Sequence, residues 1–275
     1  MEIFHEVTFS SDDRVEAILD ALCIQYRKSE FFEKYTIFFE IAESDPRWDQ
    51  IRDLMAEKGK HDYAFDTAFT DEEILKAAWL RMFGFPQIGY PQPEKLWLAE
   101  SPNYADWCRQ CGGFRQVSSF FIKKEPKMRR WDFMSLFWTS AVFAVSRVFA
   151  ALEANRIQGY ERWPVLLHKT KEPSAIVSQL YLPHITQGPG LVHADELGPV
   201  ICLACGVLKY NHYHKRGVMY LRKEAIPSDV DFFQTFEWFG EGYQPRREVI
   251  VSNRVAQLAY AEKWRGVAFK VVELV

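Results

Sequence analysis

Two copies of the pattern Cys-x-x-Cys-Gly constrain this chain of 275 residues more than any other feature. A Cys-x-x-Cys turn directs two thiolates to one side, and the glycine lets the backbone turn sharply after the second. One such knuckle supplies half of a tetrahedral shell, and a second completes it with Zn–S bonds of ~2.3 Å. The sequence therefore predicts one structural Zn²⁺ ion that joins two distant parts of the chain, bound by Cys108, Cys111, Cys202 and Cys205.

Other roles for the cysteines are less favoured. Four thiolates leave no open position for water, which argues against catalytic zinc. A thioredoxin-like redox site needs its cysteines at the start of a helix after a strand, and neither pair has that context. Loss of the metal with retention of the fold stays open, as does ligation by His212 or His214. The fifth cysteine, Cys23, lies on the apolar side of a predicted helix and is expected to be a small buried residue.

Composition is that of a globular protein and narrows the range of partners. The net charge is −3 and the isoelectric point about 6.2, whereas nucleic-acid binders usually carry a basic stripe. The basic run 123–130 is more typical of a solvated loop, which argues against nucleic acid as a partner. The apolar stretch between Asp132 and Arg147 is shorter than the ~20 residues of a membrane span and predicts a buried helix. The N-terminus does not resemble a secretory signal, so we expect a cytoplasmic protein, in which paired cysteines point to metal.

The first third of the chain predicts a compact α+β unit. Residues 3–9 and 35–41 have strand patterns, and helices are expected over 10–22 and 45–58. Thr70 and Glu73 form a capping-box pattern ahead of a helical run that reaches Trp79. The Pro/Gly-rich segment 85–93 is the best candidate boundary, so residues 1–95 are predicted to form an N-terminal domain.

Residues 96–275 predict a double-CxxCG zinc-knuckle domain with a weak internal duplication, at about 108–165 and 202–271. Each copy has a knuckle, a predicted strand (119–122 and 218–221), a Val-Ser pair before a helical run, and a later glycine. Coincidence between two amphipathic helices is the alternative explanation. Similar halves commonly pair face to face, which would bring the knuckles together. The predicted fold class is α+β, an N-terminal unit followed by a two-copy zinc-knuckle domain.

Two further stretches carry candidate sites. The loop from His184 to Glu196 contains His193 and Asp195 and could do general acid–base work in a hydrolase-like enzyme. No matching nucleophile accompanies it, which favours a polar loop. The acidic aromatic segment after Ser228 suits a surface for a basic partner, although a buried strand explains it equally well. Its candidate partner-binding residues are Asp229, Asp231, Glu237, Trp238, Phe239 and Glu241.

The two knuckles, together with a closing segment that contains Phe239-Gly240, Val251-Ser252 and Gly266, resemble the bacterial double-CXXCG-motif proteins. These are immunity-type proteins of polymorphic toxin systems, and the resemblance covers about residues 100–275. It implies a non-enzymatic protein that binds and neutralises a cognate protein toxin. A zinc-knuckle factor associated with nucleic acid is the alternative.

Overall fold

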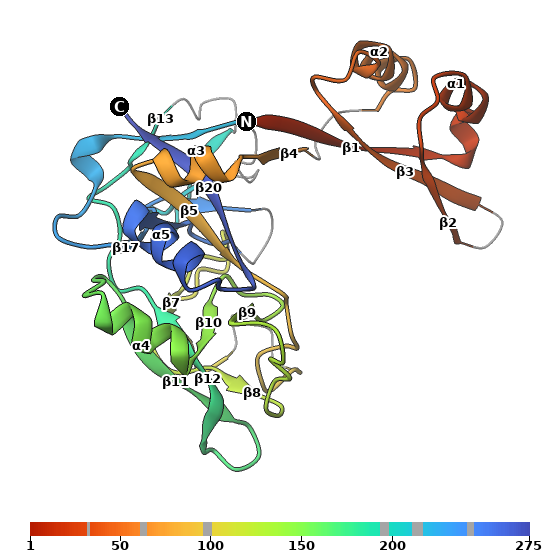
Figure 1. Ribbon diagram of the computed structural model, residues 1–275. Coiled ribbons are helices and arrows are strands. Elements are labelled where there is room, and N and C mark those ends of the chain that lie inside the picture. Colours follow the sequence, from red (N-terminus) through yellow and green to blue (C-terminus); the bar gives the residue numbers. More distant parts are fainter. Residues whose placement is uncertain (32–33, 61–64, 96–100, 193–197, 211–216, 241–244) are drawn as a thin grey trace. The chain divides into compact units, whose positions relative to one another are not determined.

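The computed structural model describes residues 1–31, 34–60, 65–95, 101–192, 198–210, 217–240 and 245–275 (Figure 1). The chain divides into two compact units. Unit 1 comprises Met1–Thr70 with Lys215–Gly217, and unit 2 comprises Asp71–His214 and Val218–Val275. Helices and strands occur in both, so the predicted α+β class is confirmed. Within the described ranges, no helix is both long and apolar enough to cross a membrane.

Unit 1, as far as it is described, contains an antiparallel sheet in the order β2-β3-β1-β4. Alternate residues such as Val7 of β1 and Ile37 of β3 point to one face and pack against Leu19 of α1 and Ile51 of α2. Both helices therefore cover the same face of the sheet (Figure 1). The elements are β1 (Glu2–Ser10), a 3-10 turn (Ser11–Asp13), α1 (Glu16–Ala21), β2 (Arg27–Phe31), β3 (Lys34–Ala42), α2 (Trp48–Glu57) and β4 (Phe65–Ala68).

The first helix is shorter than predicted, and this changes the setting of Cys23. Leu22 is the C-cap of α1, and Cys23 follows it with a φ of 53°. The Cys23 N–H donates to the Asp20 carbonyl and the Ile24 N–H to the Leu19 carbonyl. This pair of hydrogen bonds is usual where an α-helix ends with a residue in the left-handed conformation. Cys23 is therefore exposed beyond the helix, and the prediction that it is buried was wrong.

Unit 2, in its described part, is built from two larger and two smaller sheets. The first larger sheet, in spatial order, is β13 (Leu191–Val192), β16 (Met219–Leu221), β20 (Val267–Leu274), β5 (Trp79–Gly84), β19 (Val249–Ser252) and β17 (Phe232–Gln234). The second is β8 (Phe121–Ile122), β11 (Glu161–Leu167), β12 (Pro173–Tyr181), β10 (Val142–Val145) and β9 (Phe133–Ser135). The smaller sheets are β14 (Pro199–Ile201), β15 (Leu208–Tyr210) and β18 (Trp238–Phe239), and β6 (Tyr104–Ala105) with β7 (Arg115–Gln116). The helices are α3 (Asp71–Lys76), α4 (Ser146–Ala154), α5 (Asn253–Ala261) and a 3-10 turn (Lys223–Ala225).

Three predictions are corrected by these elements. Strand β5 pairs with β19 and β20 near the end of the chain, so the first unit ends at Thr70 and not near residue 95. For the same reason the helix after Thr70 stops at Lys76, because Trp79 already belongs to β5. The apolar stretch between Asp132 and Arg147 forms the antiparallel strands β9 and β10 in place of a buried helix. Trp138, with a φ of 67°, lies in the connection that reverses the chain.

The two larger sheets repeat the same pairings. In the sheet that carries α4, β12 lies between β11 and β10, and β10 also pairs with β9. In the sheet that carries α5, β5 lies between β20 and β19, and β19 also pairs with β17. One further strand joins each sheet in parallel, β8 beside β11 and β16 beside β20, and β16 also pairs with the edge strand β13. We call the two arrangements the α4 half and the α5 half.

The end of each helix contacts the other half in the same way. After α4, the Gln158 N–H donates to Oδ2 of Asp231 at 2.9 Å, and after α5 the Arg265 N–H donates to Oδ2 of Asp132 at 2.8 Å. The following residues, Gly159 and Gly266, have φ values of 94° and 88°. A Cβ at either position would clash with backbone of the other half, at Phe232 and at Phe133. The two halves are thus joined by a reciprocal pair of contacts.

Candidate metal centre

The two knuckles have the same local geometry. In the first, the Cys108 N–H donates to the Gly113 carbonyl at 2.9 Å and the Gly112 N–H to the Cys108 carbonyl at 2.8 Å. In the second, Cys202 donates to Val207 and Gly206 to Cys202 at the same two distances. Gly112 and Gly206 have φ values of 75° and 73°, a left-handed conformation that favours glycine. Each glycine of the motif therefore closes a tight turn that holds its two cysteines on one side.

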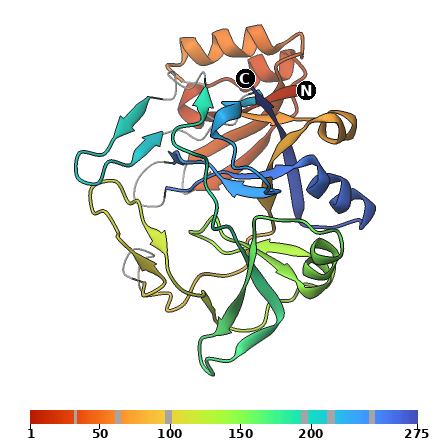
Figure 2. The same cartoon turned by 90° about the vertical axis from the view of Figure 1, so that its left-hand side faces the viewer.

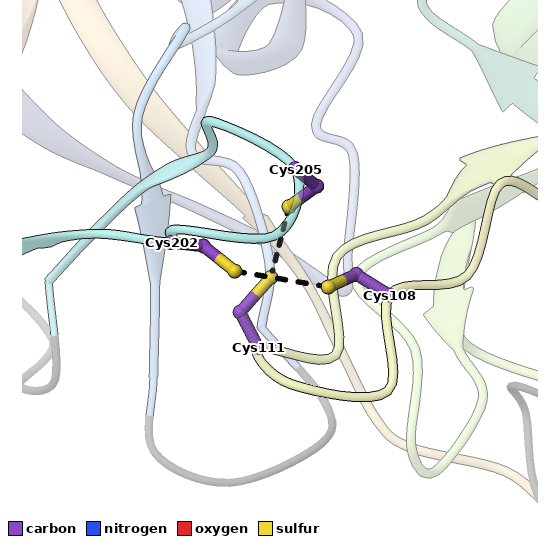
Figure 3. Close-up of side chains that lie close together, drawn as sticks. All are labelled: Cys108, Cys111, Cys202 and Cys205. Atoms are coloured by element: carbon purple, nitrogen blue, oxygen red, sulfur yellow. Dashed lines mark hydrogen bonds between the residues drawn. The ribbon is translucent and has the colours of Figure 1, made fainter.

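The structure brings all four predicted cysteines together (Figure 3). Their sulfur atoms lie within 4.8 Å of one another, with 3.7 Å between Cys108 and Cys202 and 3.5 Å between Cys111 and Cys205. In a tetrahedral ZnS₄ site with bonds of about 2.3 Å, neighbouring sulfurs lie about 3.8 Å apart. All four are free thiols, so the cluster contains no disulfide. The two chain segments that carry the knuckles, 94 residues apart in the sequence, lie side by side (Figure 2), and their cysteines form one cluster that could hold a metal ion.

The thiols differ in their readiness to ionise. Backbone N–H groups of Cys111 and Gln110 donate to the Cys108 sulfur and lower the pKa of its thiol to about 6. Burial raises the pKa of Cys111 to about 12, and burial also raises that of Cys205. Only the thiolate binds a metal, so a divalent cation must displace protons from the less acidic thiols. Metal binding at this centre is therefore coupled to proton release.

A buried lysine lies beside the cluster. Lys209, on β15 directly after the second knuckle, is 8% exposed, and its Nζ donates to the Cys111 carbonyl at 3.3 Å. Four thiolates around a divalent cation carry two net negative charges, and an ammonium group in a poorly solvated position offsets part of them. The sequence did not identify Lys209, because nothing in the local pattern distinguishes it from a surface lysine.

Some of the other predicted site residues are exposed, and some lie outside the described ranges. His184 is exposed, and its carbonyl accepts a hydrogen bond from the Gln234 N–H. Asp229 is exposed and remains available to a partner. Residues outside the described ranges are His193, Asp195, Glu196, His212, His214 and Glu241.

Four of the six candidate partner-binding residues in the acidic aromatic segment are buried, as the alternative of a buried strand predicts. Asp231, Glu237, Trp238 and Phe239 are each at most 8% exposed. The Glu237 Oε1 accepts the N–H groups of Gly190 and Leu191 at 2.6 and 2.7 Å. Asp231 accepts from Gln158 and forms an ion pair with Arg254 at 2.9 Å. These carboxylates are buried because they satisfy backbone donors from distant segments, which the local pattern cannot reveal.

Neither a comparison with models of known protein families nor one with curated proteins finds a match for this chain.

Proposed function

We propose that this protein is a zinc-stabilised binding protein with a non-catalytic metal centre, in which one Zn²⁺ ion joins two duplicated zinc-knuckle segments. The observation that carries the proposal is the cluster of Cys108, Cys111, Cys202 and Cys205, with sulfur separations close to those of a tetrahedral site. Four thiolates complete the shell of the ion, so its role is structural. The function then lies on surfaces that the metal helps to hold in place.

We further propose that the partner is a cognate protein toxin, which the protein neutralises by direct binding. This part rests on the resemblance to double-CXXCG immunity-type proteins. An exposed apolar patch supports a binding role, because such patches mark interaction sites. It consists of Val200 and Ile201 on β14 and Leu203 at the tip of the second knuckle, with exposures of 49%, 64% and 93%.

Metal analysis tests the zinc centre. Protein purified without chelator is expected to contain about one equivalent of zinc, because four thiolates complete one tetrahedral shell. Cys108→Ser and Cys202→Ser should lose most of it, whereas Cys23→Ser is the matched control, since Cys23 is exposed and outside the cluster. Wild-type protein with less than about half an equivalent, or equal zinc content in all variants, would contradict the structural site.

Co-expression with the products of neighbouring genes tests the binding role. We expect one neighbouring product to be toxic alone, to be neutralised by this protein and to copurify with it. Replacing both Ile201 and Leu203 by Ser should weaken the complex while zinc content is unchanged. Leu75→Ser is the control, because Leu75 is also exposed, at 37%, but lies on α3. Toxicity that is not relieved, with no product copurifying, would count against the immunity role and leave the zinc result untouched.

A further inference from the structure

A cavity of about 300 Å³ lies within unit 2, next to the first knuckle. Its wall includes Phe114, three residues after Cys111, together with Gln179 of β12 and Arg247, which precedes β19. The lining therefore comes from both the α4 half and the α5 half. The volume is at the lower end of the range for small-molecule sites, which leaves room for a compact ligand.

One wall of the cavity is aromatic. The ring of Phe114 meets that of Trp238 edge to face, with centroids 5.5 Å apart, and is tilted against Tyr104 at 4.1 Å. All three side chains line the cavity. Aromatic faces of this kind favour contact with a planar apolar group.

Most of the polar groups in the lining are already paired. The side-chain amides of Gln116 and Gln179 exchange two hydrogen bonds, both of 2.8 Å. Arg115 forms an ion pair with Asp106 at 2.9 Å. Among the described residues that line the cavity, none is a carboxylate, whereas two are arginines. The charge of the lining is therefore positive.

Arg247 is the exception to this pairing. Its Cζ lies 4.8 Å from the ring centroid of Trp238, and its Nη1 donates to the Thr235 carbonyl at 3.3 Å. A guanidinium has five N–H donors, and in the described part of the chain no carboxylate hydrogen-bonds to this one. Burial lowers the pKa of Arg247, which the charge of nearby Glu237 partly opposes. The half-buried guanidinium thus retains donors for an acidic group.

We propose that this cavity binds a small organic anion, with its carboxylate on Arg247 and a planar apolar body against Trp238 and Phe114. A planar fork of N–H donors matches a carboxylate in two-point geometry. The aromatic wall supplies the apolar contact. The glutamines Gln116 and Gln179 line the cavity, but their side-chain amides are hydrogen-bonded to each other and leave the carboxylate to Arg247. This binding site goes beyond the proposed function and depends on neither the toxin nor the identity of the metal.

Calorimetry with 2-naphthoate and its neutral analogue 2-naphthamide tests the site on the full-length protein. We expect saturable binding of naphthoate at micromolar to millimolar concentration, and binding of naphthamide about tenfold weaker or more, since a hydrogen bond to a charged group is lost. Arg247→Met should weaken naphthoate binding about tenfold or more, because it removes the donors and keeps the apolar stem. Arg246→Met is the matched control, because Arg246 is next to Arg247 in the sequence but is exposed and does not line the cavity.

Zinc content and the urea midpoint of each variant establish that it is folded, and the acid-to-amide comparison on the wild-type protein needs no variant. Equal affinity for naphthoate and naphthamide would overturn the proposal, as would unchanged naphthoate binding in folded Arg247→Met. Absence of naphthoate binding at millimolar concentration would also overturn it. Binding of a peptide that ends in a phenylalanine carboxylate, without binding of the free acid, would assign the cavity to a protein partner and refute the small-molecule assignment.

Discussion

Replacement of one cysteine of the cluster should remove much of the stability of unit 2. The two knuckles are 94 residues apart, and Cys202 is 5% exposed and 3.7 Å from Cys108. If the metal stays bound to one knuckle in the unfolded chain, unfolding reopens a loop of that length. Closing such a loop with a cross-link is worth about 4–5 kcal/mol. Since a site that has lost one thiolate no longer closes this loop, we expect Cys202→Ser to lower the free energy of unfolding by about 2–5 kcal/mol.

Urea unfolding with saturating zinc measures this loss. With a slope of about 2–3 kcal/mol per molar urea, the midpoint should fall by about 1–2 M. Cys23→Ser is the control for the loss of a thiol, and its midpoint should stay at the wild-type value, because Cys23 is exposed and outside the cluster. A strong chelator should lower the wild-type midpoint to that of Cys202→Ser and leave the midpoint of the variant unchanged.

The double variant Cys108→Ser/Cys202→Ser separates the metal from simple packing. Once one ligand is gone the site no longer closes, so the second substitution should add little to the loss. Additive losses that chelator does not change would mean that the cysteines act only as buried side chains. The cross-link reasoning would then be refuted, although the fold itself would stand.

Three further predictions concern the contacts between the halves and a half-buried lysine. Gly159→Ala should lower the free energy of unfolding by about 2–4 kcal/mol, because its Cβ would clash with the backbone at Phe232. Gly188→Ala, at a φ of 79° with open space around it, should cost only about 1 kcal/mol, and equal losses in urea unfolding would contradict the close approach. Asp231→Asn should cost about 1–3 kcal/mol by the same assay, because it weakens the hydrogen bonds from Gln158 and Arg254, whereas the exposed Asp229→Asn should be neutral. Burial lowers the pKa of Lys270 to about 8 from its usual 10.5. As the pH rises, Lys270 therefore loses its proton in the folded state before it does so in the unfolded state. Below pH 8 it is charged in both states, and burying the charge then destabilises the fold by the full amount. Lys270→Met should therefore raise the free energy of unfolding by about 1–2 kcal/mol at pH 7. This gain in stability should shrink as the pH rises from 8 towards 10.5. A gain that does not vary with pH, or an equal gain in the exposed Lys263→Met, would contradict it.

The sequence predicts what depends on local pattern. The strands β1 and β3, the helix α2 and the four cysteines follow from alternation, helix signals and motif spacing, all within short windows. Strand β5 was assigned to the wrong unit because its partners, β19 and β20, lie about 170–190 residues later, and no local signal encodes that pairing.

Buried carboxylates were misjudged for a related reason. Asp231 and Glu237 alternate with aromatic residues, a pattern that a binding surface and a buried strand share. What buries them is a set of donors from elsewhere, the N–H groups of Gln158, Gly190 and Leu191. A buried polar group is stable where such donors meet it, and that is a property of the tertiary fold. The sequence does not predict the positions of Arg247 and Lys209 for the same reason, because their partners also lie on other segments of the chain.

The crossing of the chain between the halves explains why the knuckles meet. Strand β5 belongs to the sheet of the α5 half, yet the residues after it continue along β9 of the α4 half, where Ser135 donates to the Pro86 carbonyl at 3.0 Å. Strand β12 belongs to the α4 half, and the residues after it continue along β17 of the α5 half, where Gln234 donates to the His184 carbonyl at 2.9 Å. Two equivalent crossings therefore join the halves through backbone hydrogen bonds. Zinc would then bind thiols that the fold has already gathered, so little ordering entropy opposes binding. Metal binding would then depend on the cysteine cluster, and the cluster on the pairing of the strands. The knuckle motif therefore predicts the ligands, but it cannot show how they are brought together.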